Sequence, residues 1–137
     1  MLVRNRKAGI ALTALAGPVS NLLMALVAML IAKGLLLLPV SGTAVSFLFT
    51  IFLVVCQTNL GLAVFNLIPI HPLDGSRVLE YFLPARAVDW IEEHEQVIYV
   101  VFMVVILFTP ILDRPLSIAS SWMYSLLNWL TSLVMGF

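Results

Sequence analysis

Long stretches without charge limit what this chain can fold into. Residues 8–32 and 34–73 contain no Asp, Glu, Lys or Arg, and neither do residues 96–112 and 115–137. A membrane-spanning helix needs about 20 consecutive apolar residues, because the hydrocarbon core is about 30 Å thick and each helical residue rises about 1.5 Å. Hydrophobic residues fill 62% of the 137 positions, above the roughly 45–50% of soluble domains. The sequence therefore predicts an all-α, multi-pass transmembrane helical bundle with about four membrane helices.

The same stretches divide the chain into elements of one membrane-embedded domain, residues 1–137. We expect core helices over residues 8–32 and 44–67, a loop and polar segment over residues 68–95, and C-terminal helices over residues 97–112 and 116–137. The last segment contains several Ser and Trp residues, so it either crosses the lipid bilayer or lies in its interface. Basic and acidic residues number seven each, and this zero net charge gives no electrostatic basis for binding nucleic acid.

The positions of the basic residues predict an orientation. Lys and Arg are retained on the cytoplasmic side of membranes more often than they are carried across. We therefore expect a cell-membrane protein with its N-terminus and the Asp74 loop in the cytoplasm. Five basic residues would then lie inside: Arg4, Arg6, Lys7, Arg77 and Arg86. With four crossings, Lys33 and Arg114 would lie outside.

Small side chains form a stripe along the first expected helix. They recur at spacings of three and four: Ala14, Gly17, Asn21, Ala25, Ala28 and Ala32. Such a stripe lets another helix backbone approach closely, which is the main source of association between helices in lipid. Pro18 removes one backbone donor there, which membrane helices tolerate when a neighbour satisfies the freed carbonyl. The stripe predicts a packing face.

The second expected helix ends in amides and prolines. Asn59 and Asn66 are seven residues apart and share one helical face, which we expect to meet protein, water or a polypeptide backbone because an unpaired amide in hydrocarbon is costly. Pro69 and Pro72 disfavour helix in the residues before them, so residues 68–71 are expected to be extended. Asp74 follows, and two roles remain open for it: a helix N-cap, or a ligand for a cation such as zinc.

Two motifs in this order resemble a known family. The segments AGPVSN and FNLIPIHPLDGSRVL resemble the Ala-Gly-Pro-x-x-Asn helix and the Asn-x-x-Pro-x-x-x-Leu-Asp-Gly signature of the site-2 proteases, the intramembrane zinc metallopeptidases, peptidase M50-like. The resemblance implies that Asp74 is the carboxylate ligand of the metal. It also implies that Asn66, Pro69 and Pro72 lie near the substrate. The structural core motif on the first helix would be Gly17, Pro18 and Asn21.

One part of the family's machinery is absent from these 137 residues. Site-2 proteases take two zinc-binding histidines and the general-base glutamate from His-Glu-x-x-His, and no such motif occurs here. We therefore expect no catalytic residue in this chain and no stable Zn²⁺ binding by the chain alone, because a catalytic zinc needs three protein ligands. His71 and the group Glu92, Glu93, His94 and Glu95 offer weaker alternatives as ligands.

Two functions remain open. The resemblance implies the downstream part of a zinc-dependent protease that hydrolyses peptide bonds in transmembrane protein substrates, as in regulated intramembrane proteolysis. A missing N-terminal segment or a separate subunit would then carry His-Glu-x-x-His. The alternative is a non-catalytic membrane-helix-binding protein, or pseudoprotease.

Overall fold

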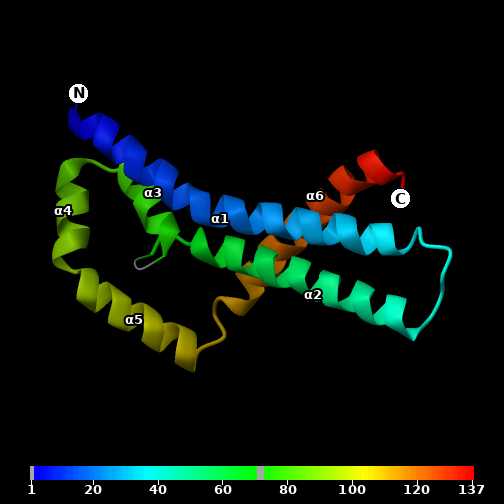
Figure 1. The fold of residues 1–137 in the computed structure, drawn as a ribbon. Coiled ribbons are helices and arrows are strands. Elements are labelled where there is room, and N and C mark those ends of the chain that lie inside the picture. The colour runs from blue at the N-terminus through cyan, green and yellow to red at the C-terminus, as the bar shows by residue number, and fades with distance from the viewer. Residues whose placement is uncertain (1, 71–72) are drawn as a thin grey trace.

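The chain folds into helices only, over the part that the structure describes. The computed structural model describes residues 2–70 and 73–137, and these form six α-helices and no strand (Figure 1). The helices are α1 (Leu2–Leu35), α2 (Thr43–Asn66), α3 (Asp74–Phe82), α4 (Ala85–Glu93), α5 (Glu95–Phe108) and α6 (Asp113–Met135). The predicted all-α class is confirmed. The segment 68–95, expected as a loop and polar segment, contains the two short helices α3 and α4.

Helices α1 and α2 lie side by side and run in opposite directions (Figure 1). The predicted small-residue face of α1 is buried in this contact: Ala25 and Ala32 are 0% exposed and Ala28 is 3% exposed. The partner residues on α2 are also small or fully covered, namely Cys56, Leu60 and Ala63. Because so little side-chain volume separates the two backbones, many atoms of α1 and α2 are in van der Waals contact. These dispersion contacts can hold the pair together in lipid, where the hydrophobic effect does not drive helices together.

Helix α1 continues through Pro18 without a break. Pro18 is fully buried, and its neighbours Gly17 and Asn21 are half-buried. The three residues of the predicted core motif therefore lie in the packed part of the helix.

Two helices can each cross a membrane by length and apolarity: residues 5–35 of α1 and the whole of α2. Helices α5 and α6 meet this condition only together, and they are bent by 87° at the break between them. With 14 residues, α5 is about 21 Å long, which is less than the hydrocarbon thickness of about 30 Å. The described chain thus has two or three spans where the sequence suggested about four.

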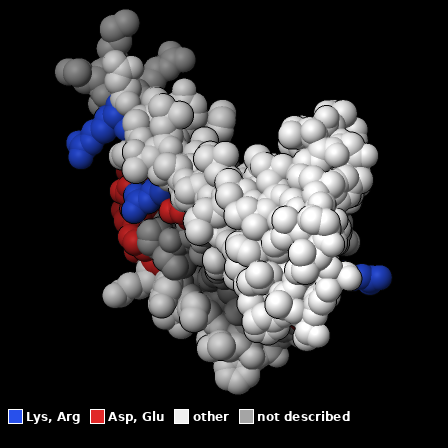
Figure 2. Space-filling model, turned by 45° about the vertical axis from the view of Figure 1, so that its right-hand side comes forward, with Lys and Arg blue, Asp and Glu red and all other residues white. Residues whose placement is uncertain are grey.

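Helix α6 packs across the α1–α2 pair. Its Leu127 belongs to one buried cluster with Met29 and Leu60, and Met123 and Tyr124 pack at the edge of that cluster. In Figure 2 most of the charged side chains lie on one side, one basic side chain projects from the opposite edge, and a broad uncharged expanse covers most of the visible face. This distribution suits a protein whose middle contacts lipid.

Candidate metal centre

Asp74 is the first residue of α3. Leu73 occupies the N-cap position with extended backbone (φ −78°, ψ 154°), and no side chain caps this helix end. The N-cap role considered for Asp74 is therefore wrong by one position. In the first turn a carboxylate is still stabilised by the positive end of the helix dipole, but its oxygens remain available to other partners.

The Asp74 carboxylate lies against α1 at a point where α1 has no side chain. A Cβ atom built on Gly17 would be 2.7 Å from Oδ2 of Asp74, which is closer than real Cβ contacts. Helix α3 packs on α1 throughout this region. The glycine of the small-residue stripe thus makes room for the carboxylate, and one side of the half-buried Asp74 lies against the membrane-crossing helix.

Gly75 constrains the position of Asp74 from the side of α2. A Cβ on Gly75 would overlap the backbone carbonyl groups of Leu67 and Ile68, so α3 begins directly against the turn that ends α2. Gly75 and Ser76 are both buried, and the Ser76 hydroxyl donates to the Leu73 carbonyl oxygen at 2.8 Å. Gly75 was not among the site residues predicted from the sequence. The Asp-Gly pair just before a helical run was the available signal.

The turn between α2 and α3 differs from the extended segment that the prolines suggested. Residues 67–70 form consecutive turns: Ile68 N–H donates to the Phe65 carbonyl at 3.2 Å, and Ile70 N–H donates to the Ile68 carbonyl at 2.8 Å. Backbone groups at membrane depth need partners, and local turns provide them where a strand would leave them open. His71 and Pro72 lie outside the described residues.

The amide face of α2 is largely withdrawn from lipid, as predicted. Asn59 is 8% exposed, and its side-chain amide donates to the Val55 carbonyl at 2.9 Å. Asn66 is the last residue of α2 and is half-buried, whereas Pro69 is exposed. Their contact with a substrate stays a prediction.

A cavity of about 500 Å³ opens beside Asp74, between α1 and α3. Its lining residues are Arg6, Gly9, Ile10, Thr13, Ala14, Asp74 and Arg77. Among the residues that the structure describes, none forms a hydrogen bond or ion pair with the Asp74 side chain. The carboxylate is therefore held in position by packing and is open to a ligand from the cavity.

The described residues do not form a complete zinc site. They contain no group of three or more His, Cys, Asp or Glu side chains that could hold a metal ion. In the group around His94, the ring Nδ1 lies 2.8 Å from the Trp90 carbonyl oxygen and the ring stacks on Trp90. Since a catalytic zinc needs three protein ligands, Asp74 fits as one ligand and cannot suffice alone.

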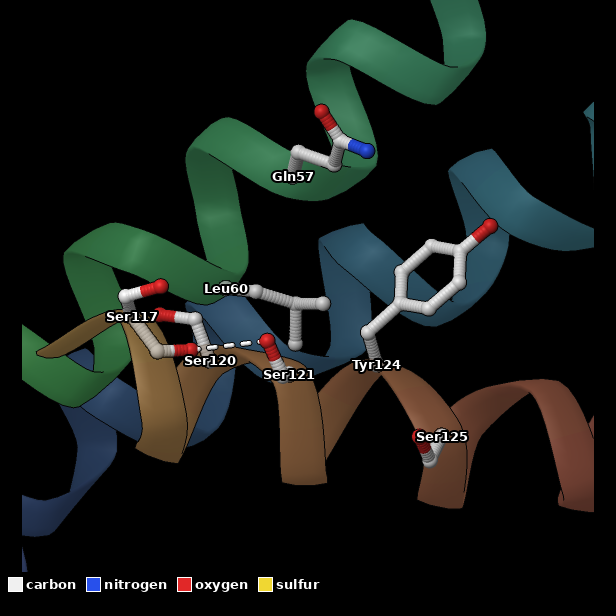
Figure 3. Close-up of a pocket in the computed structure, with 7 residues that line it drawn as sticks. All are labelled: Gln57, Leu60, Ser117, Ser120, Ser121, Tyr124 and Ser125. Atoms are coloured by element: carbon white, nitrogen blue, oxygen red, sulfur yellow. Dashed lines mark hydrogen bonds between the residues drawn. The ribbon is translucent and has the colours of Figure 1, made fainter. Parts of the chain in front are cut away.

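A second, polar cavity of about 400 Å³ lies between α2 and α6. Figure 3 shows its lining residues, Gln57, Leu60, Ser117, Ser120, Ser121, Tyr124 and Ser125. Ser121 donates its hydroxyl hydrogen to the Ser117 carbonyl at 2.8 Å. The sequence shows these polar residues, but their meeting depends on how α6 crosses α2, which no local pattern reveals.

Comparison with known proteins shows the family to which the chain belongs. The model of peptidase family M50 matches residues 33–110, a range that includes Asp74 and both prolines of the turn. The chain belongs to peptidase family M50. This assignment confirms the resemblance to the site-2 proteases, and the membrane helices together with the family identify the chain as a membrane protein of a metalloprotease family.

A relative of this M50 chain is the Bacillus subtilis (strain 168) protein named "Putative zinc metalloprotease YwhC". The two are 36% identical over 104 residues, which cover 72% of this chain and 46% of the relative. The M50 chain thus spans less than half of that relative's length. No solved structure matches it.

Proposed function

We propose that this chain is part of a zinc-dependent intramembrane metalloprotease that hydrolyses peptide bonds in the transmembrane helices of its substrates. One observation carries the proposal: the Asp74 carboxylate is packed against Gly17 of a membrane-crossing helix and faces a cavity. Asp74 also has no hydrogen bond or ion pair from a described residue. A carboxylate in this setting is usually functional, because an ionised group within a membrane protein needs a partner.

In this proposal Asp74 is one of three protein ligands of zinc. The other two, and the general base, come from a His-Glu-x-x-His segment outside these 137 residues, in the same polypeptide or on another subunit. Zinc bound there supplies Lewis-acid activation of the scissile carbonyl and of the attacking water. The chain's own contribution is positional, because Gly17 and Gly75 set where the carboxylate can lie.

The substrate must lose helical structure before it can be cut, because its own hydrogen bonds shield a helical peptide bond. Asn66, at the end of α2, offers a half-buried amide that can bond to an unwound backbone. Pro69 is exposed next to it and presents no backbone donor of its own. We assign the substrate's extended segment to this turn, and Pro72 stays a predicted substrate-side residue outside the described part of the chain. The cytoplasmic side of the cell membrane remains the proposed location of the turn, on the basic residues around it.

A chimera tests the proposal. The region of the Bacillus relative that matches this chain is replaced by residues 1–137, and zinc content and cleavage of a transmembrane substrate are measured beside the parent protein. Asp74→Asn should remove zinc and cleavage, because the amide is a poor zinc ligand of nearly the same shape. Asp89→Asn makes the same chemical change at an exposed position of α4 and should preserve both. Full zinc content in the Asp74→Asn chimera would refute the metal assignment.

The alternative function is a non-catalytic protein that binds membrane helices. It is favoured by the absence of His-Glu-x-x-His from the sequence and of a three-ligand group from the described residues. A folded chimera that binds a transmembrane substrate but never cuts it, while the parent does cut, would support this alternative.

A further inference from the structure

Lys33 is a buried cation near the end of a membrane helix. It lies in the last turn of α1 and is only 8% exposed. Its Nζ donates to the Phe137 carbonyl oxygen at 2.7 Å, to the Asn128 carbonyl oxygen at 3.2 Å and to the Ser132 hydroxyl at 3.3 Å. All three acceptors belong to the C-terminal end of α6 and the residues that follow it. A buried ammonium group is costly unless its donors are satisfied, so this contact fixes two chain segments together.

The end of α6 is suited to receive a positive charge. Gly136 ends the helix in the left-handed conformation (φ 80°). The last carbonyl groups of a helix lack partners within it and carry the negative end of its dipole. The Phe137 ring lies 6.0 Å from Nζ of Lys33, so an aromatic face adds to the attraction.

Contacts along α6 show its direction relative to α1 and α2. Near its start, the helix meets Gln57 and Leu60 of α2 through the serine-lined cavity. Further along, the Thr131 hydroxyl lies 3.4 Å from the sulfur of Met29 in α1. It ends at Lys33. Helix α6 therefore runs from the Asn66 half of α2 to the C-terminal end of α1, parallel in sense to α1.

We propose that the chain crosses the membrane three times, with α6 as the third span and the break between α5 and α6 on the side of the N-terminus, and that Lys33 holds the end of α6 on the opposite side. Helix α5 is too short to cross, whereas α6 has 23 residues and is about 34 Å long, enough to reach from one side to the other. Because the two helices are bent by 87°, they cannot both run along the membrane normal. The inference does not depend on which side is cytoplasmic, nor on the protease proposal.

This topology changes the expected distribution of charge. In a four-crossing chain Arg114 would share a side with Lys33, and Phe137 would return to the side of the N-terminus. With three crossings, six of the seven basic residues lie on the N-terminal side, and Lys33 is the exception. Lys33 is also buried, and its ammonium group donates hydrogen bonds to the end of α6 and the residue that follows it. The three-crossing arrangement thus agrees better with the usual bias of Lys and Arg.

Single cysteines read by a membrane-impermeant maleimide test the topology in intact cells and inverted vesicles. Ser41→Cys, in the connection between α1 and α2, and Ala85→Cys, at the start of α4, mark the two sides. Ile111→Cys and Phe137→Cys are the reporters, and no substitution removes a charge. Native Cys56 is 0% exposed and stays in place, with the unsubstituted chain as background. Position 137 should label with position 41, and position 111 with position 85. Labelling of 137 with 85, or of 111 with 41, would overturn the three-span topology.

A cross-link tests the role of Lys33 separately. A Cβ on Gly34 would be 3.9 Å from Cε, the far end of the Met135 side chain, so cysteines introduced by Gly34→Cys and Met135→Cys should be joined by a short thiol-specific bifunctional reagent. Adding Lys33→Met, which keeps length but removes the charge and the donors, should largely abolish the cross-link. Lys33→Arg should preserve it. An undiminished cross-link with Lys33→Met would refute the anchoring role. If Lys33→Met prevents folding, Ser132→Ala, which removes one acceptor, should weaken the cross-link partially, and no change there would equally count against the anchor.

Discussion

Replacing Gly17 by alanine separates the proposed role of Asp74 from simple stability. The added Cβ would lie 2.7 Å from Oδ2 of Asp74, and ordinary contact begins at 3.4 Å. The carboxylate must therefore move by about 0.7 Å, the difference between these two distances. Because the clashing atom is the far end of a flexible side chain, rotation of Asp74 relieves the clash at little cost to folding.

The expected effects on stability and on function have opposite signs. Glycine is less favourable than alanine inside a helix by about 1 kcal/mol, so Gly17→Ala should leave the free energy of unfolding unchanged or raise it slightly. A zinc site needs its ligands within roughly 0.5 Å of the productive geometry, and a misplacement of about 1 Å can lower a rate about 100-fold. We expect Gly17→Ala to reduce cleavage by roughly 10- to 100-fold in the chimera and to lower its zinc content.

The assay compares cleavage rate, zinc per protein by metal analysis, and the thermal midpoint in detergent. Gly61→Ala in α2 is the matched control, because a Cβ there meets nothing within 4 Å and the gain in helix propensity is the same. It should retain both zinc and activity. If Gly17→Ala keeps full zinc and full activity, the Asp74 carboxylate is not held at the metal by this contact, and the site proposed here is wrong.

Three further outcomes follow from the packing. Gly75→Ala should lower the thermal midpoint strongly, because its Cβ meets the backbone carbonyls of Leu67 and Ile68, which cannot rotate away; a cost of about 1–3 kcal/mol is expected, and an unchanged midpoint would contradict it. Leu60→Ala should cost about 2 kcal/mol or more, measured by unfolding in detergent, because Leu60 is 1% exposed in the shared core. The purified chain alone should contain no stoichiometric zinc, and one equivalent that disappears with Asp74→Ala would revive His71 or His94 as a partner ligand.

Helix periodicity predicts faces well and partners poorly. The small residues of α1 identified its buried stripe, and the N-cap considered at Asp74 located the start of α3 to within one residue. The same prolines suggested an extended segment, because local preferences do not include the need of membrane-depth carbonyls for partners. The close approach of Gly17 to Asp74 joins residues 57 positions apart, and only the resemblance to a family pointed to it.

The number of candidate spans in the structure is lower than the sequence suggested. The apolar run after Glu95 continues to Leu112, and by composition it resembles a membrane helix. Pro110 interrupts it, so α5 ends at Phe108 and the chain turns sharply. Lys33 looked like an ordinary outer-side charge, because nothing in its neighbourhood along the sequence reveals the carbonyls of residues 128 and 137. The break at Pro110 is a local feature of the sequence, whereas the role of Lys33 depends on contacts between segments that are distant in the sequence.

The proposed position of Lys33 implies a depth for Asp74 in the membrane. If Lys33 marks the far boundary of the hydrocarbon, about 30 Å at about 1.5 Å per residue reaches back 20 residues, to Thr13. Gly17 then lies about 6 Å inside the near boundary, and the Asp74 carboxylate is in contact with it. An ionised carboxylate at that depth needs either water or a cation. The cavity lined by Thr13, Arg6 and Arg77 gives water a path from the near side, as hydrolysis of a membrane-embedded peptide bond requires. The depth and the open carboxylate are thus consistent with one function, the binding of a metal ion where substrate helices and water can both arrive.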